Sequence, residues 1–350
     1  MNAPRVSVVI PTFNRARLVG LTIDSVLAQS YRDMEIIVVD DGSTDDTPQV
    51  LAKYGDRIRA IRQPNGGMNA ARNAGIAQAR GEYLALLDSD DLWLPFKTAL
   101  QVELLDRFPQ TGFVFSEFFI LRDDSGTAGE RQPRGLRSWY SGDFDWAAFY
   151  LRNWRARDLA LQTPADADFG VYQGCVYERS LDEPTVLPST TLIRRAALDR
   201  HGLRLPVDDN SCGDWEFFAR LSRLEGALFC DLETTLNRSH EDAVRLTRVD
   251  PRRRLALRIA MIDRVWRSDG EFMARNAAAV ERLESRLLHR LARTQLLYSD
   301  AEAARGSLRR AGELERGRRS AADWATFCAA HLPGSGPALS TLRRLMSGRG

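Results

Sequence analysis

The first 120 residues alternate short apolar runs with segments of helical periodicity, and this alternation limits the chain to few folds. The runs are nearly continuous in β-branched and large apolar residues, as expected of strands covered on both faces. After the first run, Val19, Ile23 and Val26 fall on one face of a helix. Strands that alternate with helices predict βαβ units, hence an α/β fold with a mainly parallel sheet. The expected strands are residues 6–10, 35–40, 57–61, 83–88 and 112–121.

The rest of the chain divides by composition. We expect Ser43 or Thr44 to cap the second helix, and Pro95 to lie in the first turn of the fourth. The polar residues 123–135 are predicted to form a loop. Residues 139–177 are rich in aromatics, which predicts either core or a variable insertion over a binding cleft. The pattern from residue 252 to about 319 predicts two or three amphipathic helices, packed as a small bundle or a hairpin.

Charge is unevenly distributed along the 350 residues, although the net charge is only +2. Residues 245–350 carry 22 Arg against 11 Asp and Glu, a charge of +11, which leaves −9 for residues 1–244. A basic C-terminal third predicts attraction to phosphate groups such as anionic lipid headgroups. The alternative is a solvated helical surface.

Targeting and redox features indicate a cytoplasmic protein, peripheral at a membrane at most. The N-terminus has no apolar stretch of the secretory type, and no apolar run is long enough to span a bilayer. The four cysteines lack CxxC spacing, which argues against a zinc knuckle or a disulfide framework and suits a reducing compartment.

Polar residues follow each of the first four expected strands. Because ligands of open α/β sheets bind at the carboxyl ends of the strands, these segments are expected to meet on one rim. They offer carboxylates, amides, the nearby Arg72 and glycines that allow close backbone approach. The segments are residues 11–14, 40–43, 65–69 and 88–91.

Asp88, Asp90 and Asp91 directly follow an expected buried strand. Their negative charges repel one another unless a cation offsets them. Mg²⁺ and Mn²⁺ take such oxygen ligands together with substrate phosphates, so the turn predicts a divalent-metal site. The alternative is an acidic cluster at a helix start, with Asp91 as its cap. No GxGxxG, GxxxxGK[ST] or GxSxG sequence appears, so a dinucleotide fold, a P-loop and a nucleophile elbow are not supported.

Four motifs, in order, resemble those of family 2 glycosyltransferases with the GT-A fold. The likeness is close over about residues 5–121 and looser at residues 187–196, 213–216 and 238–240. It implies a Rossmann-like α/β sandwich (residues 1–245) with a nucleotide-sugar half (1–121) and an acceptor half with an insertion (122–245), followed by a helical region (246–350). The motifs are VSVVIPTFN, EIIVVDDGSTDDT, NGGMNAARNAGI and GEYLALLDSDD.

The resemblance also implies residue roles. Asp214 matches the catalytic base, although Gly213 stands where relatives commonly carry Glu. Asp90 and Asp88, with His240, match positions that hold Mn²⁺ or Mg²⁺. A helix cap is the alternative for Asp214, and a surface histidine the alternative for His240. The residues that match donor-binding positions are Pro11, Thr12, Asn14, Asp40, Asp41, Arg72, Asp88 and Ser89.

The expected reaction moves a sugar from a nucleoside-diphosphate donor, a UDP-sugar by resemblance, to an acceptor hydroxyl with inversion. Such a reaction needs cations for the departing phosphate and a carboxylate for the hydroxyl proton. The expected partners are a saccharide or lipid-linked acceptor of bacterial surface polysaccharide or glycolipid synthesis, and the inner membrane through the basic helices, with no nucleic acid. The alternatives are a sugar nucleotidyltransferase and a catalytically silent nucleotide-sugar-binding module.

Overall fold

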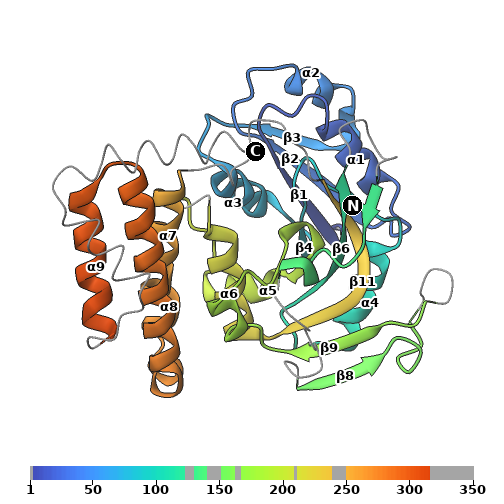
Figure 1. Ribbon diagram of the computed structural model, residues 1–350. Helices are drawn as coiled ribbons and strands as arrows, with labels where there is room; N and C mark the ends of the chain where they lie inside the picture. The colour runs from blue at the N-terminus through green and yellow to red at the C-terminus, as the bar shows by residue number, and fades with distance from the viewer. Residues whose placement is uncertain are drawn as a thin grey trace. The chain divides into compact units, whose positions relative to one another are not determined.

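The computed structural model describes residues 3–122, 130–139, 151–161, 167–208, 211–238 and 250–315. The chain forms two compact units, Met1–Ala243 and Val244–Gly350. Figure 1 draws both units.

The first unit is built on one twisted sheet, which has 11 strands within the described residues. Its first part is parallel: β1 pairs with β2 on one side and β4 on the other, and β2 pairs with β3. These four strands match expected ones, with β3 shifted towards the C-terminus. Their bounds are Val6–Thr12 (β1), Met34–Asp40 (β2), Arg59–Arg62 (β3) and Tyr83–Leu86 (β4).

The other half of the sheet mixes directions. The short β10 is inserted antiparallel between β4 and β6, and β11 runs parallel to β6. The α/β fold with a largely parallel central sheet is therefore confirmed, with the antiparallel β10 inside the sheet and further antiparallel strands at the β8 edge. The bounds are Leu92–Trp93 (β5), Phe113–Arg122 (β6), Glu130–Gln132 (β7), Arg152–Arg155 (β8), Gly170–Gly174 (β9), Leu192–Arg194 (β10) and Ala227–Arg238 (β11).

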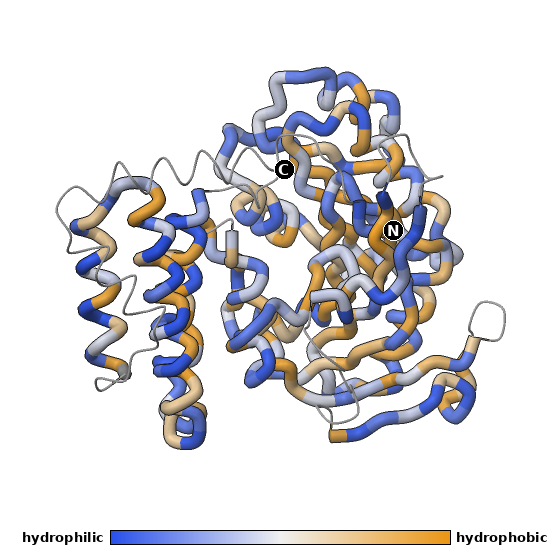
Figure 2. Tube along the Cα trace, viewed as in Figure 1, coloured by the Kyte–Doolittle hydropathy of each residue, from blue (hydrophilic) through white to orange (hydrophobic). Residues whose placement is uncertain are grey.

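Helices cover both faces of the sheet because alternate strand residues point to opposite sides. Val8 and Ile10 of β1 belong to a core that includes α1, α2 and α4, while Val9 belongs to a core that includes α3, α5 and α6. Figure 2 shows the hydrophobic residues gathered in the central strands. The helices are Val19–Leu27 (α1), Thr47–Ala52 (α2), Met68–Gln78 (α3), Lys97–Arg107 (α4), Arg195–His201 (α5) and Gly213–Glu225 (α6).

Two predicted helix starts are wrong. Asp46, not Ser43 or Thr44, occupies the N-cap position of α2. The reason is that Ser43 and Thr44 form hydrogen bonds with Asn14 instead. The Asn14 N–H donates to Ser43 Oγ at 2.9 Å, and the Asn14 side chain accepts from the Thr44 N–H at 2.8 Å. Pro95 likewise lies before α4, whose N-cap position is Phe96.

The predicted loop at residues 123–135 is wrong in part, because β7 lies within it and pairs with β6. The aromatic segment contributes β8 and β9 at the sheet edge, and its residues 140–150 and 162–166 lie outside the described part. Single 3₁₀ turns are Gly55–Arg57, Arg137–Trp139, Arg179–Leu181 and Pro188–Thr190.

The second unit contains the expected amphipathic helices, α7 (Pro251–Ile262), α8 (Gly270–Leu297) and α9 (Ala301–Glu315), with a π turn at Asp263–Arg267. Leucines at helical spacing on α8 are buried, and the buried Glu284 pairs with Arg310 of α9. None of the helices in the described residues combines the length and the hydropathy that crossing a bilayer requires.

Candidate active site

The carboxyl ends of β1 and β2 present two buried polar groups. Thr12 lies opposite Asp40 in the parallel register, and both are nearly inaccessible. Among the described residues, Thr12 Oγ1 and Asp40 Oδ2 accept or donate no hydrogen bond. The nearest cation is Arg62, whose Nε lies 3.7 Å from Asp40 Oδ2. Because buried polar groups are normally satisfied, the two atoms indicate a polar ligand at this rim.

Asn14 and Asp41 fix the loops around these groups. Asn14 adopts a left-handed conformation, with φ of 51°, and its side-chain oxygen accepts from the Thr44 N–H (2.8 Å) and the Asp45 N–H (3.4 Å). Asp41 accepts hydrogen bonds from the N–H groups of Gly66 (2.9 Å) and Gly67 (2.8 Å), directly before α3. Both side chains therefore hold the backbone on which a ligand would lie.

Arg72 of α3 is wholly buried and pairs with the acidic turn. Its Nη2 lies 2.5 Å from Asp88 Oδ1, and its Nη1 donates to Asn69 Oδ1 at 3.2 Å. Its Nε has no hydrogen-bond partner among the described residues. Burial alone would lower the pKa of Arg72, but the carboxylates of Asp88 and Asp214 raise it. The charged guanidinium of Arg72 thus lies near both Asp88 of the acidic turn and Asp214 of α6, which are far apart in the sequence.

Asp214 lies in the first turn of α6, whose N-cap position is Cys212. The alternative interpretation of Asp214 as the helix cap is therefore wrong. Its Oδ1 accepts from the Trp215 N–H at 2.8 Å. Burial raises the pKa of Asp214, and the charge of Arg72 opposes that rise. A partly buried carboxylate with an elevated pKa beside a cation is suited to accept a proton.

Asp91 has a structural role, because its carboxylate joins the acidic turn to other segments of the chain. It precedes β5 rather than a helix, so the predicted helix cap is wrong for this residue. Its carboxylate accepts from Ser189 Oγ (2.5 Å), Asn237 Nδ2 (3.0 Å) and the Arg238 N–H (3.1 Å). Burial, followed by the charge of the neighbouring aspartates, raises the pKa of Asp91. The residue fastens the acidic turn to β11 and to the Pro188–Thr190 turn.

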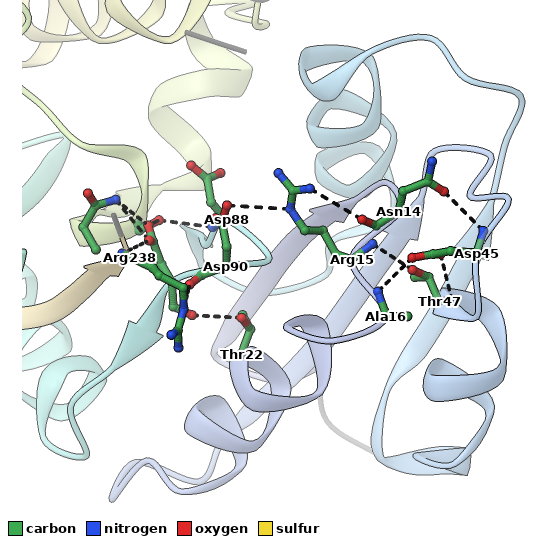
Figure 3. Close-up of polar contacts among 12 residues, drawn as sticks. Asn14, Arg15, Ala16, Thr22, Asp45, Thr47, Asp88, Asp90 and Arg238 are labelled. Atoms are coloured by element: carbon green, nitrogen blue, oxygen red, sulfur yellow. Dashed lines mark hydrogen bonds and ion pairs between the residues drawn. The ribbon is translucent and has the colours of Figure 1, made fainter. Parts of the chain in front are cut away.

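Asp90 points towards the loop after β1, as Figure 3 shows. The Nε of Arg15 lies 3.7 Å from Asp90 Oδ2, and Arg238 Nε donates to the Asp90 backbone carbonyl at 3.2 Å. Arg15 was not predicted, although its position next to Asn14 was a usable signal. Arg238 belongs to the loosely matching residues 238–240, but its contact with Asp90, 148 positions away, was not predicted.

Asp88 and Asp90 are the carboxylates of the acidic turn that a divalent cation would use. Within the described residues, no group of three or more His, Cys, Asp or Glu side chains is arranged to hold a metal ion. Mg²⁺ and Mn²⁺, however, are commonly held by one or two carboxylates together with substrate phosphates and water. The side chains of Asp88 and Asp90 are each 24% exposed, as such a site needs.

The remaining predicted site residues are placed as follows. Pro11 and Ser89 are buried at the same rim. His240 lies outside the described residues. The structure thus gathers Thr12, Asn14, Asp40 and Asp41 at the β1 and β2 ends, and Arg72, Asp88 and Asp214 between α3, β4 and α6.

Comparison with known proteins gives the family. The model of glycosyl transferase family 2 matches residues 7–200, more than half of the chain. The chain belongs to this family. Among curated relatives, the Escherichia coli glucosyltransferase WfaP is 37% identical over 120 residues, which cover 34% of this chain and 47% of WfaP. The chain spans roughly a fifth to a half of the length of the curated relatives that it matches.

Solved structures support the GT-A fold expected for this family 2 member. The S. aureus TarS fragment 1–349 in complex with UDP aligns with a TM-score of 0.51 at 16% identity, over 93% of this chain and 90% of that fragment. The Pyrobaculum calidifontis mannosyltransferase PcManGT, in complex with GDP-Man and Mn²⁺, aligns with a TM-score of 0.50 at 18% identity, over 98% and 85% of the two chains.

Proposed function

We propose that this family 2 glycosyltransferase moves a sugar from a nucleoside-diphosphate donor to an acceptor hydroxyl, with inversion at the anomeric carbon. The observation that carries the proposal is the buried Arg72, which pairs with Asp88 at 2.5 Å and acts electrostatically on Asp214. A cation for the leaving group and a carboxylate for the proton are thus close together, although the residues are far apart in sequence.

The donor end of the site is assigned to the rim. Thr12 and Asp40, with their unsatisfied oxygens, are proposed to bind the base, and Arg72 to offset the charge of the diphosphate. Asp88 is proposed to bind the ribose, and Asp90 with Asp88 to hold Mn²⁺ or Mg²⁺. Such an ion supplies charge stabilisation to the departing diphosphate.

Asp214 is proposed to act as the general base. The acceptor oxygen attacks the anomeric carbon while the bond from that carbon to the diphosphate oxygen breaks. Asp214 takes the hydroxyl proton, and the nucleoside diphosphate leaves with the electron pair. The raised pKa of Asp214 supports this role, because a stronger base removes the proton more readily.

A uridine donor and a lipid-linked or saccharide acceptor are proposed by likeness. TarS is solved with UDP and UDP-GlcNAc, and the name of WfaP gives UDP-Glc and a diphosphoundecaprenol acceptor. We assign residues 1–121 to the donor and residues 122–245 to the acceptor, and place the reaction in surface polysaccharide or glycolipid synthesis.

Contact with an anionic membrane surface is proposed for α8. Five exposed arginines recur every three, four or seven residues, which places them along one face of this helix. A row of this kind is attracted to anionic headgroups within a Debye length. Flotation with anionic vesicles at low salt tests the contact, and failure to float would remove it. The residues are Arg275, Arg282, Arg286, Arg290 and Arg293.

The function is tested by a thermal-shift screen of nucleotide sugars with and without Mn²⁺, followed by product analysis. A preferred donor raises Tm by mass action. Release of nucleoside diphosphate is expected; release of pyrophosphate would indicate a nucleotidyltransferase. Donor binding without turnover on any lipid-linked or saccharide acceptor would favour a silent binding module.

A further inference from the structure

Arg15 places a positive charge beside Asp90. Its backbone N–H donates to Thr47 Oγ1 at 2.9 Å, and its Nη1 donates to the Asn14 carbonyl at 3.5 Å. These contacts direct the guanidinium across the rim, so that Nε lies 3.7 Å from Asp90 Oδ2 (Figure 3). The side chains of Arg15 and Asp90 are only 17% and 24% exposed, so water screens the pair incompletely.

The position of Arg15 conflicts with a divalent ion at the same carboxylate. A cation bound to Asp90 would lie within a few ångströms of the guanidinium, and like charges at that distance repel strongly in a partly buried site. Arg238 contacts the same residue from β11, where its Nε donates to the Asp90 backbone carbonyl at 3.2 Å. Arg15 and the ion therefore compete for Asp90.

We propose that Arg15 makes binding of the divalent ion conditional on the donor. This inference rests on the proposed function. Without donor, Arg15 neutralises Asp90 and weakens binding of the ion. A donor diphosphate offers the guanidinium other anionic oxygens, for which Arg is well suited. Arg15 then leaves Asp90 to the ion. Arg15 is thus a positioning residue that couples the two ligands.

The coupling can be measured as binding, without turnover. Mn²⁺ is titrated into the full-length chain with and without saturating UDP, and free Mn²⁺ is read by electron paramagnetic resonance. In the wild type, UDP should tighten Mn²⁺ binding by about 10- to 100-fold, within the usual range of coupling between two ligands. Arg15→Gln should bind Mn²⁺ about 10-fold more tightly than the wild type when UDP is absent, and should lose most of the coupling.

Two further variants separate the pair from general charge effects. Arg15→Lys keeps the cation and should retain most of the coupling. Arg17→Gln removes the same charge from an exposed side chain of the same loop and should leave Mn²⁺ binding unchanged. Melting curves of all variants check the fold.

The outcomes distinguish this inference from the proposed function. If Arg15→Gln binds Mn²⁺ without UDP as weakly as the wild type, or if Arg17→Gln tightens binding equally, the role of Arg15 is wrong although the donor site stands. If the wild type binds UDP but no Mn²⁺ under any condition, the metal part of the proposed function fails, and the role of Arg15 fails with it.

Discussion

The side-chain amide of Asn69 occupies the space that a β-carbon on residue 213 would need. A Cβ built on Gly213 would lie 2.3 Å from Asn69 Nδ2. That amide cannot easily move, because it is buried, donates to the Pro206 carbonyl at 2.9 Å, and its oxygen accepts from Arg72. Glycine at position 213 thus has a physical reason in this chain. Asn69 joins the helix that carries Arg72 to the helix that carries Asp214.

Gly213→Ala should therefore destabilise the fold by about 1–3 kcal/mol, the usual cost of overpacking. The added methyl group would displace Asn69 and disturb Arg72, so activity should fall as well. Gly306→Ala is the matched control, since a Cβ there meets nothing within 4 Å. Urea unfolding measures both. The Asn69→Ala/Gly213→Ala double variant should be more stable than additivity predicts; strict additivity would argue against the contact.

Asp214→Asn should lower kcat by about 10²- to 10⁴-fold, because the amide cannot take the acceptor proton. UDP binding, measured by calorimetry, should remain near that of the wild type. Asp208→Asn, which changes an exposed carboxylate of the preceding loop, should leave the rate unchanged. Because burial raises the pKa of Asp214 above the ordinary 3.8, the acid limb of the rate profile should lie above that pH. Full activity of Asp214→Asn would exclude this base.

Asp91→Ala should destabilise the protein by about 1–3 kcal/mol, because Ser189, Asn237 and the Arg238 N–H would lose their buried acceptor. Asp90→Asn, next to it, should change stability little. Thermal unfolding of the two variants separates the structural aspartate from the proposed metal ligand. Equal stability of both variants would contradict the assignment.

Glu117 should make stability depend on pH. Burial, together with the nearby Asp231 and Glu233, raises its pKa from 4.5 to about 7. The folded state thus holds a proton that the unfolded state releases near pH 4.5. The resulting stability is present below about 4.5 and is lost as pH rises through about 7.

Urea unfolding at several pH values tests this dependence. Glu117→Gln should flatten the pH dependence between these limits by at most about 3 kcal/mol. Glu313→Gln, an exposed change on α9, should leave the curve as it is. A Glu117→Gln curve that still follows the wild type would contradict the raised pKa.

Local patterns were enough to predict the polar rim at the strand ends, but not the contacts that hold the acidic turn in place. β1, β2 and β4 are continuous apolar runs whose polar ends had to meet on one edge, so Asp40 and Asp88 could be placed from sequence. β10 has three residues and lies antiparallel between β4 and β6, an insertion that no periodicity reveals. That strand and the turn before it bring Ser189 to Asp91.

Contacts between distant segments explain the other differences between the predicted and the observed structure. Arg238 reaches Asp90 because it is the last residue of the long strand β11, which also brings Asn237 to Asp91. Ser43 and Thr44 looked like helix caps, but contacts with Asn14, thirty positions away, determine their conformation. A sequence pattern within one helix or strand does not reveal partners that lie so far away in the chain.

The position of a bound Mn²⁺ ion tests most directly the proposal that the acidic turn binds the donor diphosphate through a metal ion. Crystals of the full-length chain soaked with UDP and Mn²⁺ would be measured at the manganese absorption edge. We expect an anomalous peak against the Asp90 carboxylate, the UDP diphosphate within reach of Arg72, and Arg15 turned away from Asp90. A peak distant from Asp88 and Asp90, or a diphosphate bound away from Arg72 with the Arg15–Asp90 pair intact, would contradict the proposed site.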